Sequence, residues 1–225
     1  MRRSVLVLSL ALLGIPGCSR KQAPTVPQPS TPVTHANARA FGEAAPALMK
    51  ALTEPTEALH FSYQATAQVN PKYPHTDGEK PELGPVSMEA DVRPDSVAFT
   101  AVRGTKTDKV SAKKDNELAW SMAKLPLMGP MMNVGMYLAF AAPAARSADG
   151  VAWTFDSRAL GATEKAGMAL AQSMLRGKVK VEQIYGELTV DAASGRLATF
   201  QFDVELKDEA GQTWKEHHSG KAFRN

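Results

Sequence analysis

Cysteine is almost absent from this sequence, since Cys18 is the single one among 225 residues. One thiol cannot form a disulfide within the chain or supply the sulfur ligands of a structural metal site. The sequence also contains no G-x-S-x-G, H-E-x-x-H or Walker motif, which are signatures of hydrolases, zinc proteases and nucleotide-binding enzymes. We therefore expect a protein that is not an enzyme and that holds no metal and no cofactor.

The sequence also has no marked excess of positive or negative charge. The chain has 26 Lys and Arg against 23 Asp and Glu. Arg2 and Arg3 belong to a segment that we expect to be removed, so the mature protein is closer still to neutrality. No aromatic-and-basic platform is visible either, and we expect no binding to nucleic acid.

The beginning of the chain has the organisation of a secretory signal. Residues 1–3 include two arginines, residues 4–15 are nearly all apolar, and Gly17 stands before Cys18. A basic start, an apolar middle and a small residue at the cleavage site are typical of a signal peptide. The apolar run is shorter than the ~20 residues that a transmembrane helix needs.

The sequence Ile15-Pro16-Gly17-Cys18 resembles the bacterial lipobox, in which an aliphatic and a small residue precede an invariant cysteine. The resemblance implies that residues 1–17 are a lipoprotein signal peptide and that Cys18 carries a diacylglyceryl group and becomes the acylated N-terminus. Each buried methylene adds about 0.8 kcal/mol to membrane binding, so two or more chains form a firm anchor. The alternative is an ordinary signal peptide with a chance cysteine. Ser19, where retained lipoproteins have aspartate, indicates the outer membrane, facing the periplasm.

The rest of the chain divides into a tether and one domain. Residues 18–37 comprise the lipidated cysteine and a stretch rich in Pro, Ser and Thr, which cannot bury a core and favours extended conformations. Residues 38–225 are of ordinary size for a single domain.

Apolar periodicity predicts an α+β domain. Helices are predicted at 38–54, at 130–142 after Gly129, and at 163–175. Alternation and turn residues predict antiparallel strands at 59–69, 86–92, 96–102, 106–112, 117–122, 151–155, 179–190, 196–206 and 212–223.

This order of elements resembles the half-barrel of the bacterial lipoprotein carriers LolA and LolB and of the mycobacterial LppX-type lipoproteins. The resemblance covers residues 38–223, and the segment GELTVDAASGRLATFQFDVEL is similar to the late strands of that group. It implies a curved antiparallel sheet with helices packed on its concave face over an apolar cavity. A generic α+β antiparallel sheet is the alternative.

A methionine-rich, almost uncharged segment at 125–145 supplies the candidate ligand-binding residues. They are Met128, Met131, Met132, Met136, Tyr137, Leu138 and Phe140. Methionine suits adaptable apolar surfaces, so we expect a helix that covers a site for a lipid or for the acyl part of a lipoprotein. The alternatives are plain core packing, a docking surface for an envelope protein, and a copper(I) site built from thioethers.

Histidine supplies the remaining candidates. His217 and His218 are adjacent in a predicted strand, so their side chains point to opposite faces and cannot chelate one ion. We interpret both as solvated residues at a sheet edge, although one imidazole could act with Glu216. His60 falls on the polar face of its strand and is also interpreted as solvated.

Overall fold

The computed structural model describes residues 35–69, 85–139, 141, 143–159 and 179–225. The expected signal peptide, Cys18, most of the tether, the predicted helix at 163–175 and Phe140 lie outside these residues. The described elements are α1 (His35–Thr53), β1 (Leu59–Val69), β2 (Val86–Val92), β3 (Ser96–Arg103), β4 (Lys106–Lys113), α2 (Glu117–Ala139), β5 (Pro143–Arg146), β6 (Ala152–Asp156), η1 (Ser157–Ala159), β7 (Lys180–Val190), β8 (Leu197–Lys207) and β9 (Thr213–Arg224).

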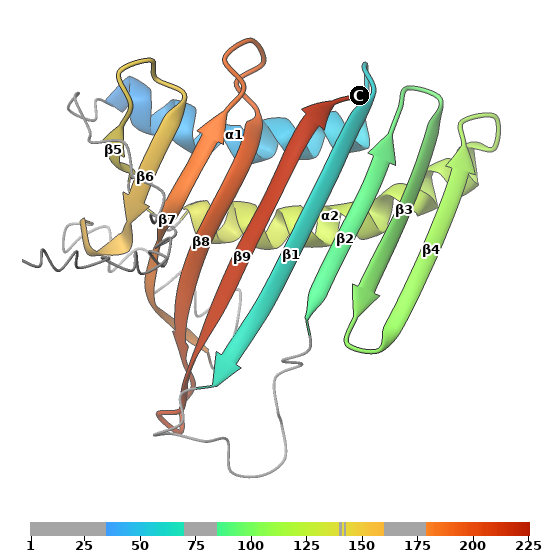
Figure 1. The fold of residues 1–225 in the computed structure, drawn as a ribbon. Coiled ribbons are helices and arrows are strands. Elements are labelled where there is room, and N and C mark those ends of the chain that lie inside the picture. The colour runs from blue at the N-terminus through green and yellow to red at the C-terminus, as the bar shows by residue number, and fades with distance from the viewer. Residues whose placement is uncertain (1–34, 70–84, 140, 142, 160–178) are drawn as a thin grey trace, which may run out of the picture.

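All nine strands belong to one open antiparallel sheet, in the order β4-β3-β2-β1-β9-β8-β7-β6-β5 (Figure 1). Neighbouring strands follow each other in the sequence except at the centre, where the first strand pairs with the last. This central pairing extends from Leu59 opposite Arg224 to Val69 opposite Trp214. The predicted α+β class with an antiparallel sheet is confirmed.

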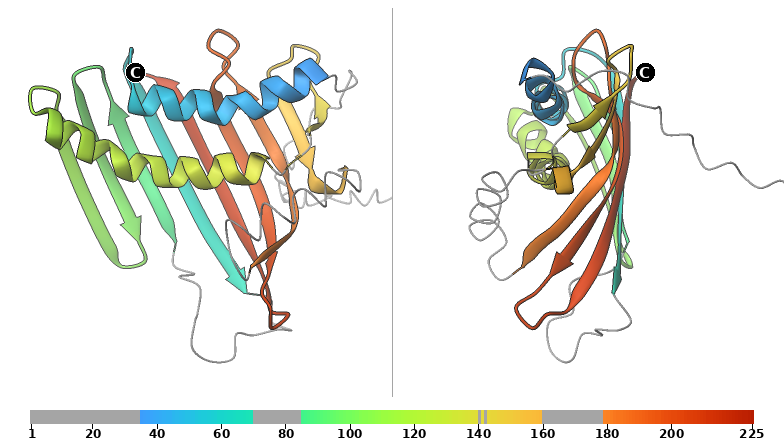
Figure 2. Two further views of the ribbon diagram at one scale, coloured as in Figure 1. Left: turned by 180° about the vertical axis from the view of Figure 1, so that it is seen from behind. Right: turned by 90° about the vertical axis from the view of Figure 1, so that its left-hand side faces the viewer.

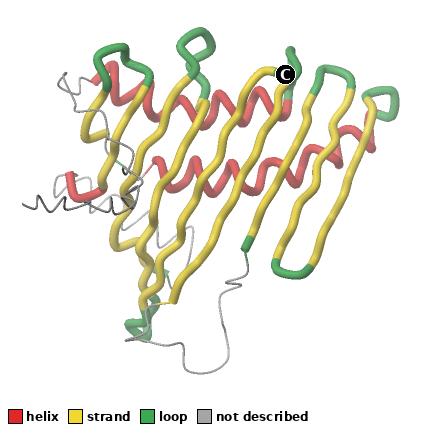
Figure 3. Tube along the Cα trace, viewed as in Figure 1, coloured by secondary structure: helices red, strands yellow, loops and turns green. Residues whose placement is uncertain are grey.

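Both helices lie on the same face of the sheet (Figures 2 and 3). We call this the inner face and the opposite one the outer face. Helix α2 runs across the strands from the β4 edge to the neighbourhood of β7 (Figure 2). Its 23 residues give a length of about 35 Å at ~1.5 Å per residue. Nine strands spaced ~4.8 Å apart make a sheet about 38 Å wide, so α2 crosses most of the width of the sheet.

Alternation along the strands separates the two faces. Phe61 and Tyr63 of β1 and Phe202 of β8 are buried under the helices, whereas Gln64 and Gln201 are exposed on the outer face. A half-buried strand requires this period of two. The central strands therefore form as their patterns predict.

Helix α1 covers part of the inner face with the apolar side that its sequence predicts. Leu48 and Leu52 are buried, and the Phe41 ring lies 6.0 Å from the Trp153 ring and 5.5 Å from the Phe155 ring. Pro46 lies inside the helix without ending it.

The prediction of a strand at 117–122 is wrong, because this segment is the first turn and a half of α2. The side chain of Asn116 accepts a hydrogen bond from the backbone N–H of Ala119 at 3.1 Å, which is the contact of a helix N-cap. The helix predicted from 130 thus begins at Glu117, and Pro126 and Pro130 lie within it. The short strand β5 was not predicted.

Two glycines are required by close packing on the inner face. Gly186 is the register partner of Phe202, and Gly220 is the register partner of Phe200. A Cβ atom at position 220 would lie 2.5 Å from Phe200 Cζ and 2.7 Å from the carbonyl oxygen of Ser62. The space beside each glycine is filled by an aromatic side chain of the neighbouring strand.

We expect Gly220→Ala to lower the free energy of unfolding by about 1–3 kcal/mol, because the added methyl group overpacks the Phe200 ring and a strand backbone. Gly42→Ala is the control, since nothing lies within 4 Å of a Cβ at this exposed position of α1. We expect it to raise stability by about 0.5–1 kcal/mol. Urea unfolding followed by circular dichroism measures both, and equal effects of the two changes would contradict this packing.

Candidate functional site

The candidate residues of the methionine-rich segment lie on different sides of α2. Met131, Tyr137 and Leu138 are buried in the core with exposed fractions of 1%, 0% and 3%. Met132 is 59% exposed, and Met128 and Met136 are partly exposed. The structure therefore divides these residues between the core and the surface.

The side of α2 turned away from the sheet carries an exposed apolar stripe. Its most exposed residues are Leu118, Met122, Leu125 and Met132, each more than half exposed. Their spacings of four, three and seven residues keep them on one side of the helix. We call these four residues, together with the partly exposed Met128 and Met136, the α2 stripe.

The α2 stripe contains no charged residue. The two charged residues of α2 are Glu117 at its start and Lys124. The Lys124 ammonium donates a hydrogen bond to the carbonyl oxygen of Thr53 at 2.7 Å, and it lies 4.7 Å from the centre of the Trp120 ring. Lys124 thus joins α2 to the C-terminal end of α1, where a cation is favourable.

The spacing of the methionines along α2 disfavours the copper(I) alternative. Met128 and Met136 are separated by eight residues, about 12 Å along the helix axis, which disfavours one copper(I) ion held by both and by Met132. Among the described residues, no cluster of three or more His, Cys, Asp or Glu side chains is placed to bind a metal ion.

The side of α2 that faces the sheet takes part in a buried polar network. Tyr137 Oη donates a hydrogen bond to Glu216 Oε2 at 2.8 Å, and His218 Nε2 lies 3.1 Å from the same oxygen. Tyr63 Oη lies 2.9 Å from His218 Nδ1, and Trp214 Nε1 donates to Glu216 Oε1 at 3.2 Å. We call these five residues the core network. It joins α2 to both central strands of the sheet.

Alternation along β9 explains which histidine enters the core network. Residues 214, 216 and 218 point to the inner face, and residues 215 and 217 to the outer face. The His218 side chain is 4% exposed and its ring stacks on Phe202 at 4.9 Å. The prediction that the two histidines face opposite ways fits this arrangement, but the interpretation of His218 as solvated is wrong. Trp214 and Ala222, which are buried and share its side of the strand, were the sequence signal for this burial.

On the outer face, His217 belongs to a surface group of charges. It is 51% exposed, and its Nδ1 lies 2.9 Å from Asp203 Oδ1. Lys215 donates hydrogen bonds to the hydroxyl of Tyr185 and to Asp203 Oδ2, and both raise the pKa of Lys215 above its usual value. Burial favours the neutral form of Asp203 and would raise its pKa. The hydrogen bonds from Lys215 and His217 outweigh this effect and keep the pKa of Asp203 below the usual value.

His60 lies on the outer face, as its strand pattern predicts, but it is only 23% exposed. Its Nδ1 lies 3.0 Å from Asp91 Oδ1 and its Nε2 lies 2.9 Å from Glu89 Oε2. The hydrogen bond to Asp91 is the main cause that raises the pKa of His60, against a smaller opposing effect of burial. The two carboxylates hold the imidazole of His60 in place on the outer face.

A comparison with protein-family models finds no match for this chain, and a comparison with curated proteins finds no significant relative. Within the described ranges, neither α1 nor α2 combines the length and the hydrophobicity that a bilayer-spanning segment needs.

We expect His218→Leu to lower the free energy of unfolding by about 1–3 kcal/mol, because it removes a buried partner of Tyr63 and Glu216. The adjacent, exposed His217→Leu is the control, and we expect a change within about 0.5 kcal/mol. Urea denaturation of both variants checks the assignment. A larger loss for His217→Leu would mean that the register of β9 is wrong.

Proposed function

We propose that this protein is a lipid-anchored lipoprotein of the outer membrane, facing the periplasm, and that its folded body binds the acyl chains of a lipid or of another lipoprotein. The observation that carries this proposal is the α2 stripe. Four large apolar side chains, 54–74% exposed, lie on one side of one helix. Contiguous apolar surface of this kind is typical of a ligand or membrane contact.

The composition of the α2 stripe favours acyl chains over a protein partner. Protein interfaces are enriched in aromatic residues, arginine and methionine; the stripe contains leucine and methionine but no aromatic residue and no arginine. Methionine side chains are flexible and adapt to chains of varying shape. Covering one such side chain contributes roughly 1.5–3 kcal/mol, so binding needs no specific polar group.

We place the acyl contact on the exposed side of α2. The side toward the sheet is occupied by Leu127, Met131 and Val134, each at most 1% exposed. We propose further that the open sheet curves around its helices as a half-barrel, as in the LolA-like carriers. An acyl chain would then lie along the α2 stripe, outside the packed interior.

The proposed anchor can bring the α2 stripe to a membrane. Sixteen residues lie between Cys18 and His35, where α1 begins. A proline-rich tether of this length reaches about 50 Å at ~3.1 Å per residue. This reach exceeds the width of the sheet, so the anchor does not restrict which side of the body meets lipid.

A test of the anchor is Cys18→Ala. We expect this variant to lose its acyl groups and to move from the detergent phase to the aqueous phase on Triton X-114 partitioning, because the thiol that carries the lipid is gone. Ser19→Ala, which leaves the cysteine in place, is the control. Equal partitioning of the two variants, with no acyl mass on the Ser19→Ala variant, would rule out lipidation at Cys18.

A test of the ligand site is Met132→Glu in residues 19–225, with Asn133→Glu as the matched control. Both positions are exposed on the same turn of α2, and only Met132 belongs to the α2 stripe. We expect native mass spectrometry with added phospholipid to show at least about tenfold less bound lipid for Met132→Glu, because a carboxylate opposes acyl contact. Lipid binding equal in both variants, or absent in the unmodified chain, would favour the docking module. Added copper(I) in the same experiment tests the thioether alternative.

A further inference from the structure

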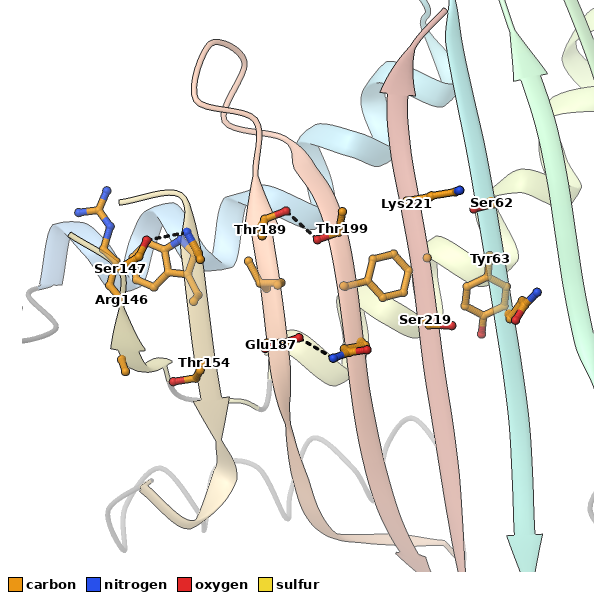
Figure 4. A pocket seen from close by; sticks show the side chains of 18 of the residues that line it. Ser62, Tyr63, Arg146, Ser147, Thr154, Glu187, Thr189, Thr199, Ser219 and Lys221 are labelled. Carbon is orange, nitrogen blue, oxygen red and sulfur yellow. Dashed lines mark hydrogen bonds between the residues drawn. The ribbon is translucent and has the colours of Figure 1, made fainter. Parts of the chain in front are cut away.

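The outer face of the sheet contains a groove that is separate from the helices. Its volume is about 630 Å³, and its lining comes from strands β5 to β9, β1 and β2 and from Ser147 just after β5, with no residue of α1 or α2. Figure 4 shows its labelled side chains spread across neighbouring strands. The groove thus crosses the strands instead of running along one of them.

The strand register explains the floor of the groove. Trp153, Leu188, Phe200, Gly220 and Tyr63 are successive register partners across the sheet. The side chains of this row turn to the inner face, where the aromatic and leucine members are at most 3% exposed, and Gly220 has none. On the outer face the row therefore presents main chain alone, which leaves a trough between the rows on either side.

One wall of the groove is a row of five polar side chains, two of which are glutamine amides. In register order it consists of Thr154, Glu187, Gln201, Ser219 and Gln64. Gln201 Nε2 donates a hydrogen bond to a Glu187 carboxylate oxygen, which leaves the Gln201 carbonyl oxygen free to accept from a ligand.

The other wall consists mainly of hydroxyl groups. Its register order is Ala152, Thr189, Thr199, Lys221 and Ser62. The hydroxyl oxygens of Thr189 and Thr199 lie 2.7 Å apart, as the dashed line in Figure 4 marks. Hydroxyl groups both donate and accept, so the two walls can bond to a ligand with hydroxyl groups on both of its edges.

The dimensions and charge of the groove restrict the ligand. The four steps from β6 to β1 cover about 19 Å at ~4.8 Å per strand, so an occupant must be extended and straight. Glu187 and Glu89 in the lining are matched by Lys221 and Arg146. This balance favours an uncharged ligand over an anion or a cation.

A peptide strand is disfavoured as the occupant. Strands β6 to β9 and β1 lie inside the sheet, so their backbone groups are directed to neighbouring strands. A peptide binds a sheet by adding to a free edge, and the floor of this groove has none. Recognition must come from side-chain hydroxyl and amide groups.

We propose that this groove binds a linear, uncharged oligosaccharide with β-1,4-linked sugar units. Such a chain is an extended ribbon with hydroxyl groups along both edges, which matches a main-chain floor between two polar walls. The groove lies on the opposite face from the α2 stripe and does not depend on lipid binding.

The test is isothermal titration calorimetry of the full chain, purified in detergent, with chitotetraose and cellotetraose at millimolar concentration. We expect binding of at least one of them, and the double variant Gln64→Ala with Gln201→Ala should weaken it about tenfold, because two hydrogen-bonding side chains are lost. Gln68→Ala is the matched control, an exposed glutamine on the outer side of the same strand but outside the groove. We expect it to bind as the unmodified chain does.

Ser219→Tyr provides an independent variant, since its ring would fill the groove and should abolish binding. Circular dichroism confirms that each variant is folded. Binding of chitotetraose alone would assign the groove to glycans with acetamido groups, and binding of cellotetraose as well to β-1,4 glycans in general. No heat with either sugar, or equal binding by the double variant and Gln68→Ala, would overturn the proposal. Met132→Glu should leave sugar binding unchanged, which separates this site from the lipid site.

Discussion

The crossing of the sheet by α2 is the constraint on which this architecture depends. The strands before α2 extend the sheet to one edge at β4, and the strand after it begins at the other edge, β5. The chain can continue only by traversing the whole sheet, and a helix of 23 residues covers most of that distance. One side of α2 must then pack on many strands, while the opposite side remains uncovered by the sheet. The α2 stripe follows from this geometry.

The core network determines how α2 sits on the sheet. Apolar packing alone leaves a helix free to rotate or slide, because α2 is apolar on nearly every side. Tyr137 removes this freedom, since its hydroxyl reaches Glu216, which is also bonded to Trp214 and close to His218. A largely buried carboxylate such as that of Glu216, 18% exposed, would be costly without such partners, so the bonded arrangement is specific. It directs Met131 and Leu138 into the core and Met132 outward.

The two faces of the sheet are built from the same strands but suit different ligands. Gly220 illustrates the connection: its missing side chain admits the Phe200 ring on the inner face, and its main chain forms part of the groove floor on the outer face. A side chain at this position would point to the inner face and change the core packing. The proposed lipid contact on α2 and the proposed sugar contact on the outer face are compatible, because the sheet separates them.

Local pattern determined much of this protein. The strict alternation in LHFSYQATAQV and in the last three strands predicted elements that the structure contains, because a half-buried strand needs a period of two. The pattern failed at 117–122, where a helix that is apolar on nearly every side has no period to distinguish it from a strand. Tertiary structure decided the rest. The burial of His218 and the groove both depend on the pairing of β1 with β9, and Tyr63 meets His218 across 155 residues of chain. Contacts over that distance depend on strand register, which no local pattern specifies.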